Sequence, residues 1–145
     1  MSEFKISLEW KNTFTSEGYV RDHVVHFGGN QTLHNSAAPE YSGNPNMTNP
    51  EELLASALAS CHMLTFLAIC SKSGLQVESY SDNATAILDK NTDGKMAITQ
   101  ITLRPQIKFK GDNIPSTEKI KTIHDKAHHN CFVANSIKPH VEIIC

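Results

Sequence analysis

The chain has 145 residues, of which 39% are apolar and 19% charged, and its formal net charge is −2 at pH 7. A chain of this length can bury roughly two-thirds of its unfolded surface in one core, so we expect a single domain over residues 1–145. Because the net charge is small and Lys and Arg do not cluster, neither nucleic acid nor a membrane surface is expected as a partner.

The first ten residues, MSEFKISLEW, alternate in polarity and lack the charged and apolar regions of a signal peptide. Four cysteines without a secretory signal are typical of a reducing compartment, where thiols are catalytic, metal-binding or inert. We therefore expect a cytoplasmic protein.

The N-terminal third predicts a small sheet and a long loop. Residues 4–10 alternate as a half-buried strand, and residues 19–27 predict its hairpin partner, which would carry Arg21. A short strand over residues 32–34 follows. Residues 35–48 have many turn-forming residues and no periodicity, which is typical of a lid or binding loop.

The next segment, NPEELLASALASCHMLTFLAIC over residues 49–70, predicts a central helix. Asn49 can cap it, Pro50 suits its first position, and Glu52 can close a capping box. Apolar residues occupy every face, so we expect burial all round, with Cys61 near the middle. The polar residues that argue against a membrane span are Ser56, Ser60, His62 and Thr65.

The remainder predicts two long strands over residues 75–89 and 95–109, joined at an Asp-Gly turn. A change of apolar register in the second strand predicts a bulge. A helix over residues 116–130 and a closing strand over residues 139–144 complete the chain. The order of elements predicts an α+β fold.

Spacing separates the four cysteines. Cys70 lies nine residues after Cys61, about 13 Å along the helix axis, so the two cannot bridge within one chain. Cys70 is interpreted as a small core residue, and Cys145 at the end of the chain as incidental. Cys61 and Cys131 remain as a pair able to react with each other.

A nucleophilic cysteine must be a thiolate, and burial alone raises a thiol pKa, so a donor or cation is required. Cys61 is about three turns into its helix, beyond the reach of the helix dipole. The two arginines are Arg21 and Arg104. From the residues alone, the preferred interpretation of Arg21 is an exposed strand arginine, and Glu51 is also interpretable as a favourable charge on the first helical turn.

The histidines suggest a metal site as an alternative. His124 and His128 are spaced i, i+4, Cys131 follows three residues later, and His62 adjoins Cys61. However, neighbouring helical residues project about 100° apart and no C-x-x-C pair is present, so we expect no metal. His62 is expected to line the pocket beside Cys61 or to pack in the core.

Two motifs together resemble the OsmC/Ohr family of thiol peroxidases (osmotically inducible protein C and organic hydroperoxide resistance protein). The first is NPEELL over residues 49–54 with Cys61 ten residues after Glu51, and the second is Cys131 within AHHNCFVANSIK. The resemblance covers essentially the whole chain. It implies antiparallel sheets packed around a central buried helix, in an intertwined homodimer.

The resemblance also implies a mechanism without metal or organic cofactor. Cys61 would attack an organic hydroperoxide and Cys131 would close a disulfide with it. Arg21 would activate Cys61, and Glu51 would orient Arg21. A dithiol, for which a lipoylated protein is a candidate, would restore both thiols. The substrate would contact His62, Met63 and Phe132; His62 and Phe132 depart from the best-known branches of the family.

Glu51 lies about 15 Å along the axis from Cys61 of its own helix, too far for one site. The resemblance resolves this, because sites in such dimers combine residues of both subunits. Two other classes stay open: a Cys/His acyl-transfer enzyme, which needs a histidine bonded to Cys61, and a binding module that uses the loop over residues 35–48.

Overall fold

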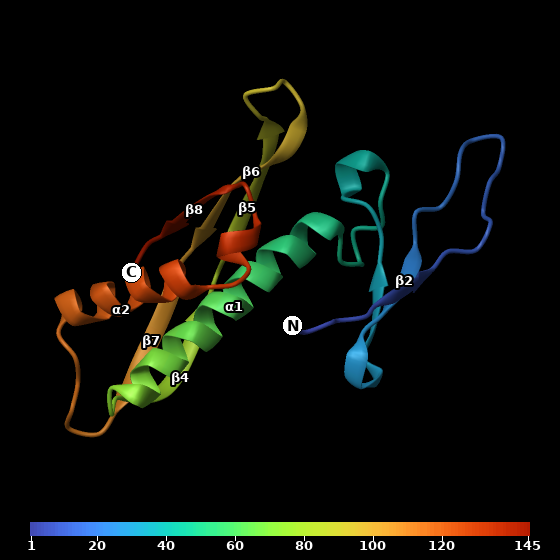
Figure 1. The fold of residues 1–145 in the computed structure, drawn as a ribbon. Helices are drawn as coiled ribbons and strands as arrows, with labels where there is room; N and C mark the ends of the chain where they lie inside the picture. Colours follow the sequence, from blue (N-terminus) through green and yellow to red (C-terminus); the bar gives the residue numbers. More distant parts are fainter. The chain divides into compact units, whose positions relative to one another are not determined.

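The computed structural model describes all residues from Met1 to Cys145, which form two compact units, Met1–Leu53 and Leu54–Cys145. The expectation of one domain over residues 1–145 stays a prediction. The chain contains two α-helices, eight strands and three short 3-10 turns (Figure 1), so the α+β class is confirmed.

The N-terminal unit contains an antiparallel three-stranded sheet. Its strands β1 (Ser7–Glu9), β2 (His23–His26) and β3 (Thr32–Asn35) pair in chain order. The hairpin and the third strand are confirmed, although the first two strands are shorter than predicted. Two 3-10 turns, η1 (Gly28–Asn30) and η2 (Pro39–Tyr41), lie in its loops.

Arg21 precedes β2 rather than lying on it, which corrects the expectation from the sequence. The His23 ring bonds the Arg21 carbonyl through Nδ1 at 2.8 Å. Side-chain bonds of this local kind compete with the strand ladder. Asp22 is also tied down, because its carboxylate accepts from Ser36 Oγ at 2.9 Å and Asn44 Nδ2 at 3.2 Å.

The long helix α1 (Pro50–Lys72) begins at Pro50 as predicted and continues two residues past the predicted end at residue 70. The Asn49 side-chain oxygen accepts the Glu52 N–H at 2.9 Å. At the other end Gly74 takes a positive φ of 69°, and the Leu75 N–H bonds the Cys70 carbonyl at 2.9 Å. Glycine adopts this left-handed conformation without steric cost, so it stops the helix.

Burial along α1 is confined to one stripe, so the expectation of a helix buried all round is wrong for this chain. The fully buried residues of α1 are Leu58, His62, Phe66 and Cys70. They recur every four residues and therefore share one face. On another face Leu64 is 59% exposed. Length and composition alone would let α1 cross a membrane, but this buried stripe packs it as a core helix.

Four strands of the C-terminal unit form two small sheets rather than one long hairpin. β4 (Gln76–Asp82) pairs with β7 (Pro105–Lys110), and β5 (Thr85–Lys90) pairs with β6 (Met96–Leu103). Both predicted long strands are therefore broken. The Asp82 carboxylate accepts the Arg104 N–H at 2.7 Å at the point where both breaks occur, and Pro105 has no N–H to extend a ladder.

The last strand, β8 (His140–Ile143), pairs in parallel with β6, a departure from purely antiparallel sheets. The predicted bulge is confirmed at Thr99, which the β5–β6 register skips. The helix α2 (Thr117–Asn130) is capped by Ser116, whose hydroxyl accepts the Lys119 N–H at 3.2 Å. η3 (Ala134–Ser136) follows it.

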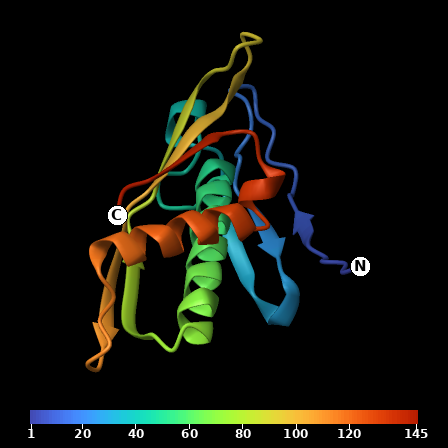
Figure 2. The ribbon, with the colours of Figure 1, turned by 60° about the vertical axis from the view of Figure 1, so that its left-hand side comes forward.

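Two apolar clusters form the core of the C-terminal unit, where α2 crosses α1 (Figure 2). Cluster 1 contains Phe66, Cys70, Leu75, Ile123 and Ala127. Cluster 2 contains Leu58, Ile101, Leu103 and Cys131. α1 contributes to both, so its buried stripe connects the two halves of this core.

Candidate active site

Two cysteines from different helices meet beside α1. Cys61 lies about three turns into the helix and is half-buried, and Cys131 caps the end of α2 and is fully buried. Cys61 packs against cluster 2, which contains Cys131, and both thiols are free. The structure therefore brings together the two cysteines that the sequence selects.

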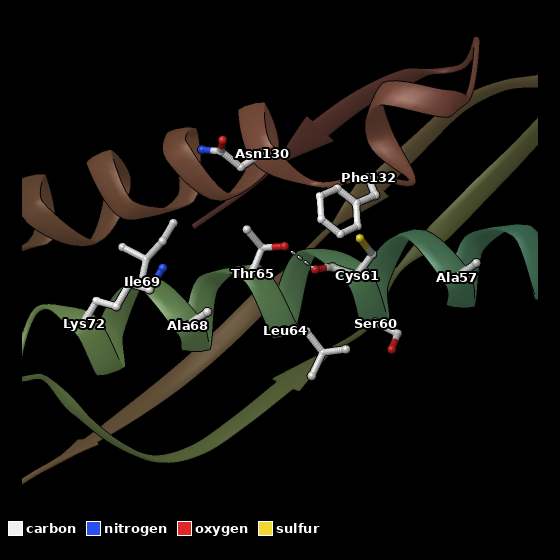
Figure 3. Close-up of a pocket in the computed structure, with 10 residues that line it drawn as sticks. All are labelled: Ala57, Ser60, Cys61, Leu64, Thr65, Ala68, Ile69, Lys72, Asn130 and Phe132. Carbon is white, nitrogen blue, oxygen red and sulfur yellow. Dashed lines mark hydrogen bonds between the residues drawn. The ribbon is translucent and has the colours of Figure 1, made fainter. Parts of the chain in front are cut away.

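The pKa of Cys61 is lowered from its ordinary value. Burial acts to raise this pKa, but hydrogen bonds from the Cys131 thiol, the Val133 and Phe132 N–H groups and the Thr65 hydroxyl together outweigh it. Each donor stabilises the thiolate. The Thr65 hydroxyl also lies 2.8 Å from the Cys61 carbonyl (Figure 3), so it divides between two acceptors.

The Cys131 thiol stays protonated. Burial raises its pKa. The neighbouring Cys61 also raises it, through the hydrogen bond between the two thiols and through repulsion between their negative charges. The Ala134 N–H points at the Cys131 sulfur at 3.4 Å. The pair is therefore polarised, because ionisation is favoured at Cys61 and disfavoured at Cys131.

A cavity of about 730 Å³ opens at Cys61. It is lined by Ala57, Ser60, Cys61, Leu64, Thr65, Ala68, Ile69, Lys72, Asn130 and Phe132. The Phe132 ring lies next to the Cys61 sulfur (Figure 3). Most of the lining is apolar and comes from α1, with the end of α2 closing one side. The cavity therefore presents the thiol to an apolar ligand.

Phe132 is thus placed at the cavity, but His62 and Met63 do not line it. Successive helical residues turn by about 100°, so the two residues after Cys61 face elsewhere. His62 is 1% exposed, and its Nε2 lies 2.9 Å from Nδ1 of His124. Of the two expected positions for His62, the core is the one observed.

Burial, together with the neighbouring His124 and His128, lowers the pKa of His62 to about 4. Burial also lowers the pKa of His124 to about 4, against the opposing charge of Asp125. Both rings are therefore neutral at pH 7. No three His, Cys, Asp or Glu side chains gather where they could hold one metal ion.

Arg21 and Glu51 both belong to the N-terminal unit, but they form no ion pair there. Arg21 Nη1 donates to the Tyr19 carbonyl at 2.6 Å, and the guanidinium lies 4.4 Å from the centre of the Tyr19 ring. Glu51 has one buried carboxylate oxygen without a hydrogen-bond partner. The expected carboxylate–arginine contact is therefore not made within this chain.

Arg21 lines a second, mainly apolar cavity of about 420 Å³ with Trp10, Phe14 and Tyr19. The three aromatic rings contact one another at centroid distances of 5.1 to 6.1 Å. The other arginine, Arg104, is engaged elsewhere, because its Nη1 donates to Thr85 Oγ1 at 3.1 Å and to the Asn83 carbonyl at 3.3 Å. Arg21 keeps more unpaired N–H donors than Arg104.

Sequence reasoning missed the donors that lower the Cys61 pKa. It required a donor or a cation and, on the family resemblance, assigned the role to Arg21, whereas the structure supplies backbone N–H groups of Phe132 and Val133. No pattern of residue types marks such donors, since every residue other than proline has an N–H. Thr65 was detectable, because a residue four positions after Cys61 lies next to it on the helix.

Comparison with known proteins places the chain in one family. The model of the family described as OsmC-like protein matches residues 43–145. The structure of an OsmC-like protein of unknown function from Vibrio cholerae is 42% identical, with a TM-score of 0.94, covering 99% of this chain and 100% of that one. The uncharacterized protein YmaD of Bacillus subtilis is 30% identical over 143 residues, 97% of this chain and 89% of YmaD.

Peroxiredoxin OsmC of Escherichia coli is 29% identical over 96 residues, which are 66% of this chain and 64% of that protein. The structure of an organic hydroperoxide resistance protein OsmC from Legionella pneumophila is 17% identical, with a TM-score of 0.74 over 99% of this chain and 94% of that one. At this identity the likeness shows the fold alone. On the family match and these relatives, the chain belongs to the OsmC-like family.

Proposed function

We propose that this protein is a cysteine-based peroxidase that reduces organic hydroperoxides. The observation that carries the proposal is the polarised thiol pair, in which Cys61 has a lowered pKa and Cys131 a raised one at the edge of an apolar cavity. A thiolate is the form that attacks peroxides. The relationship to a peroxiredoxin of Escherichia coli agrees with this chemistry.

In the first step the Cys61 thiolate attacks one oxygen of the O–O bond. That bond breaks, the alkoxide leaves and takes up a proton, and Cys61 becomes a sulfenic acid. In the second step the Cys131 sulfur attacks the Cys61 sulfur, the S–O bond breaks, and water leaves as the disulfide forms. An external dithiol then supplies two electrons and two protons to restore both thiols.

The apolar cavity lining favours an organic substrate over hydrogen peroxide. Phe132 and Leu64 offer apolar surface next to the thiolate. An alkyl or aryl group would be desolvated there, and burial of each CH₂ contributes about 0.8 kcal/mol. The reductant is a dithiol, for which a lipoylated protein is a candidate, in the reducing cytoplasm.

Arg21 is assigned to the developing charge on the leaving oxygen and Glu51 to the orientation of Arg21, both delivered to Cys61 of a second subunit in a homodimer. Glu51 lies ten residues before Cys61, about 15 Å along α1, so it cannot serve the thiol of its own helix. Its buried carboxylate oxygen without a donor supports a partner from outside the chain. A guanidinium fork suits that role.

The arrangement of histidines does not favour acyl transfer. Such an enzyme needs a histidine hydrogen-bonded to Cys61. The adjacent His62 is instead turned into the core and bonded to His124. A binding module without catalysis can be distinguished from a peroxidase by experiment. It would keep its ligand affinity after Cys61→Ala and would consume no peroxide.

The decisive test is mass spectrometry after addition of one equivalent of cumene hydroperoxide. We expect a mass loss of two hydrogens and a peptide pair linked through Cys61 and Cys131. Cys131→Ser should trap a sulfenic acid at Cys61, and Cys70→Ser should behave as the wild type. Recovery of both thiols unmodified would reject the proposal.

The shared site has its own test. Neither the Cys61→Ser nor the Arg21→Ala homodimer should turn over, but refolding the two together creates heterodimers with one intact site. We expect activity approaching half that of wild type per heterodimer. If native mass spectrometry shows heterodimers and the mixture stays inactive, the assignment of Arg21 is wrong.

A further inference from the structure

Two buried histidines join α1 to α2 by a single hydrogen bond. His62 and His124 are each 1% exposed, their Nε2 and Nδ1 atoms are 2.9 Å apart, and their ring planes differ by only 4°. Phe66 stacks on the His124 ring at a centroid distance of 4.3 Å. The other two ring nitrogens, His62 Nδ1 and His124 Nε2, have no partner. Each imidazole ring therefore relies on the other for its hydrogen bond.

This pair lies at the junction of the two apolar clusters. Along the buried stripe of α1, His62 falls between Leu58 of cluster 2 and Phe66 of cluster 1. Apolar contacts are not directional and tolerate sliding of one helix on another. A buried polar pair is directional, and its best-attested role in helical proteins is to specify register. The His62–His124 bond thus selects one alignment of α1 against α2.

The alignment matters because both cysteines are tied to these histidines by short stretches of chain. Cys61 immediately precedes His62, and Cys131 follows His124 by seven residues, two helical turns. A slip of one turn would move one thiol by about 5.4 Å relative to the other. A disulfide requires Cα atoms about 4.4 to 6.8 Å apart, so such a slip would separate the pair.

We infer that the His62–His124 hydrogen bond is a register pin between α1 and α2 that holds Cys61 and Cys131 in position to form their disulfide. The inference rests on the disulfide step of the proposed function. Neither histidine lines the cavity, so both are positioning residues rather than catalytic ones. The substrate and the reductant do not enter the argument.

The test measures disulfide formation without any peroxide. The protein is equilibrated with mixtures of oxidised and reduced dithiothreitol, in which two electrons and two protons pass from the thiols of Cys61 and Cys131 to the oxidised reagent. Cys70→Ser and Cys145→Ser in the background prevent side reactions. The equilibrium constant reports how well the two thiols are held together.

Three variants separate position from stability. His62→Phe leaves one imidazole unpaired, whereas His62→Phe with His124→Phe removes both polar groups and should recover much of the stability lost. We expect the equilibrium constant to fall about tenfold in both, since loss of one buried hydrogen bond is worth about that factor. His62→Gln with His124→Asn places amide groups where the bonded nitrogens were and should stay within about threefold of wild type.

Several outcomes would overturn the inference. One is a folded double phenylalanine variant that has the wild-type equilibrium constant. Another is a wild-type protein that forms no disulfide between Cys61 and Cys131 with this reagent. If no variant folds, the wild type still decides, because NMR should show a coupling between the two ring nitrogens across the hydrogen bond. Its absence in the folded protein rejects the pin. A wild type that forms the disulfide but consumes no peroxide refutes the peroxidase and leaves the pin standing.

Discussion

The two faces of α1 have opposite properties although they share one backbone. The buried face carries Leu58, Phe66 and Cys70 at 0 to 1% exposure, whereas the cavity face carries Cys61 and Leu64, the latter 59% exposed. On the buried face burial raises the pKa of Cys70, and on the cavity face hydrogen-bond donors lower that of Cys61. The reactivity of a thiol on this helix therefore depends on what it faces, more than on its depth in the fold.

The largest effect should come from replacing the sulfur of one cysteine on each face by oxygen. Cys61→Ser should abolish peroxide reduction, because a serine hydroxyl is not ionised at neutral pH and does not attack an O–O bond. Cys70→Ser should retain most of the activity and should instead lower the stability. Stopped-flow consumption of cumene hydroperoxide measures both. Equal rates of peroxide consumption for the two variants would show that Cys61 and Cys70 do not differ in reactivity.

Truncation of large side chains should show the reverse order in stability. Phe66→Ala removes a fully buried ring that contacts Tyr80 and His124, and should lower the free energy of unfolding by about 4 kcal/mol. Leu64→Ala should change the stability of the monomer by about 0.5 kcal/mol or less. Urea titrations of the reduced proteins give both values. Similar losses would show that the cavity face is also covered in solution.

Much of this contrast could be predicted from the sequence, and part could not. The helix cap at Asn49 is a local signal and was confirmed. The breaks in the long strands were missed because the Asp82–Arg104 bond joins residues far apart in sequence. One-sided burial was also missed, since apolar residues on all faces of α1 carry no record of which face is covered.

Acid should weaken the buried face first. The folded pKa values of His62 and His124 are about 4, below the ordinary value of 6.5, so folding favours the neutral rings. This stability is complete above pH 6.5 and is lost as the pH falls from there towards 4. The loss should reach about 3 kcal/mol for a single independently titrating histidine.

Urea titrations from pH 7 to 4 measure this loss, with the His62→Phe, His124→Phe double variant as the matched control. That variant should lose the slope between pH 6.5 and 4 and keep any contribution from the carboxyl groups. An unchanged slope would assign the acid sensitivity to other groups.

The smallest effect concerns substrate choice at the cavity face. Leu64→Asn should lower kcat/KM for cumene hydroperoxide about fivefold through lost apolar contact, and should leave hydrogen peroxide nearly unaffected. Ser73→Asn, an exposed position outside the cavity lining, is the control. A uniform decrease for both peroxides would mean that Leu64 supports the thiol and not the substrate.

The parallel pairing of β8 with β6 has a consequence for biosynthesis. β6 is the middle strand of the sheet β5–β6–β8, so it stays an open edge until His140–Ile143 has left the ribosome. An unpaired edge with buried residues such as Ile101 and Leu103 invites association with other nascent chains. The aggregation of this protein during overexpression should therefore depend on how soon the last strand is released. Slow translation near residue 140 would prolong the exposed interval, and truncation there would make the exposure permanent.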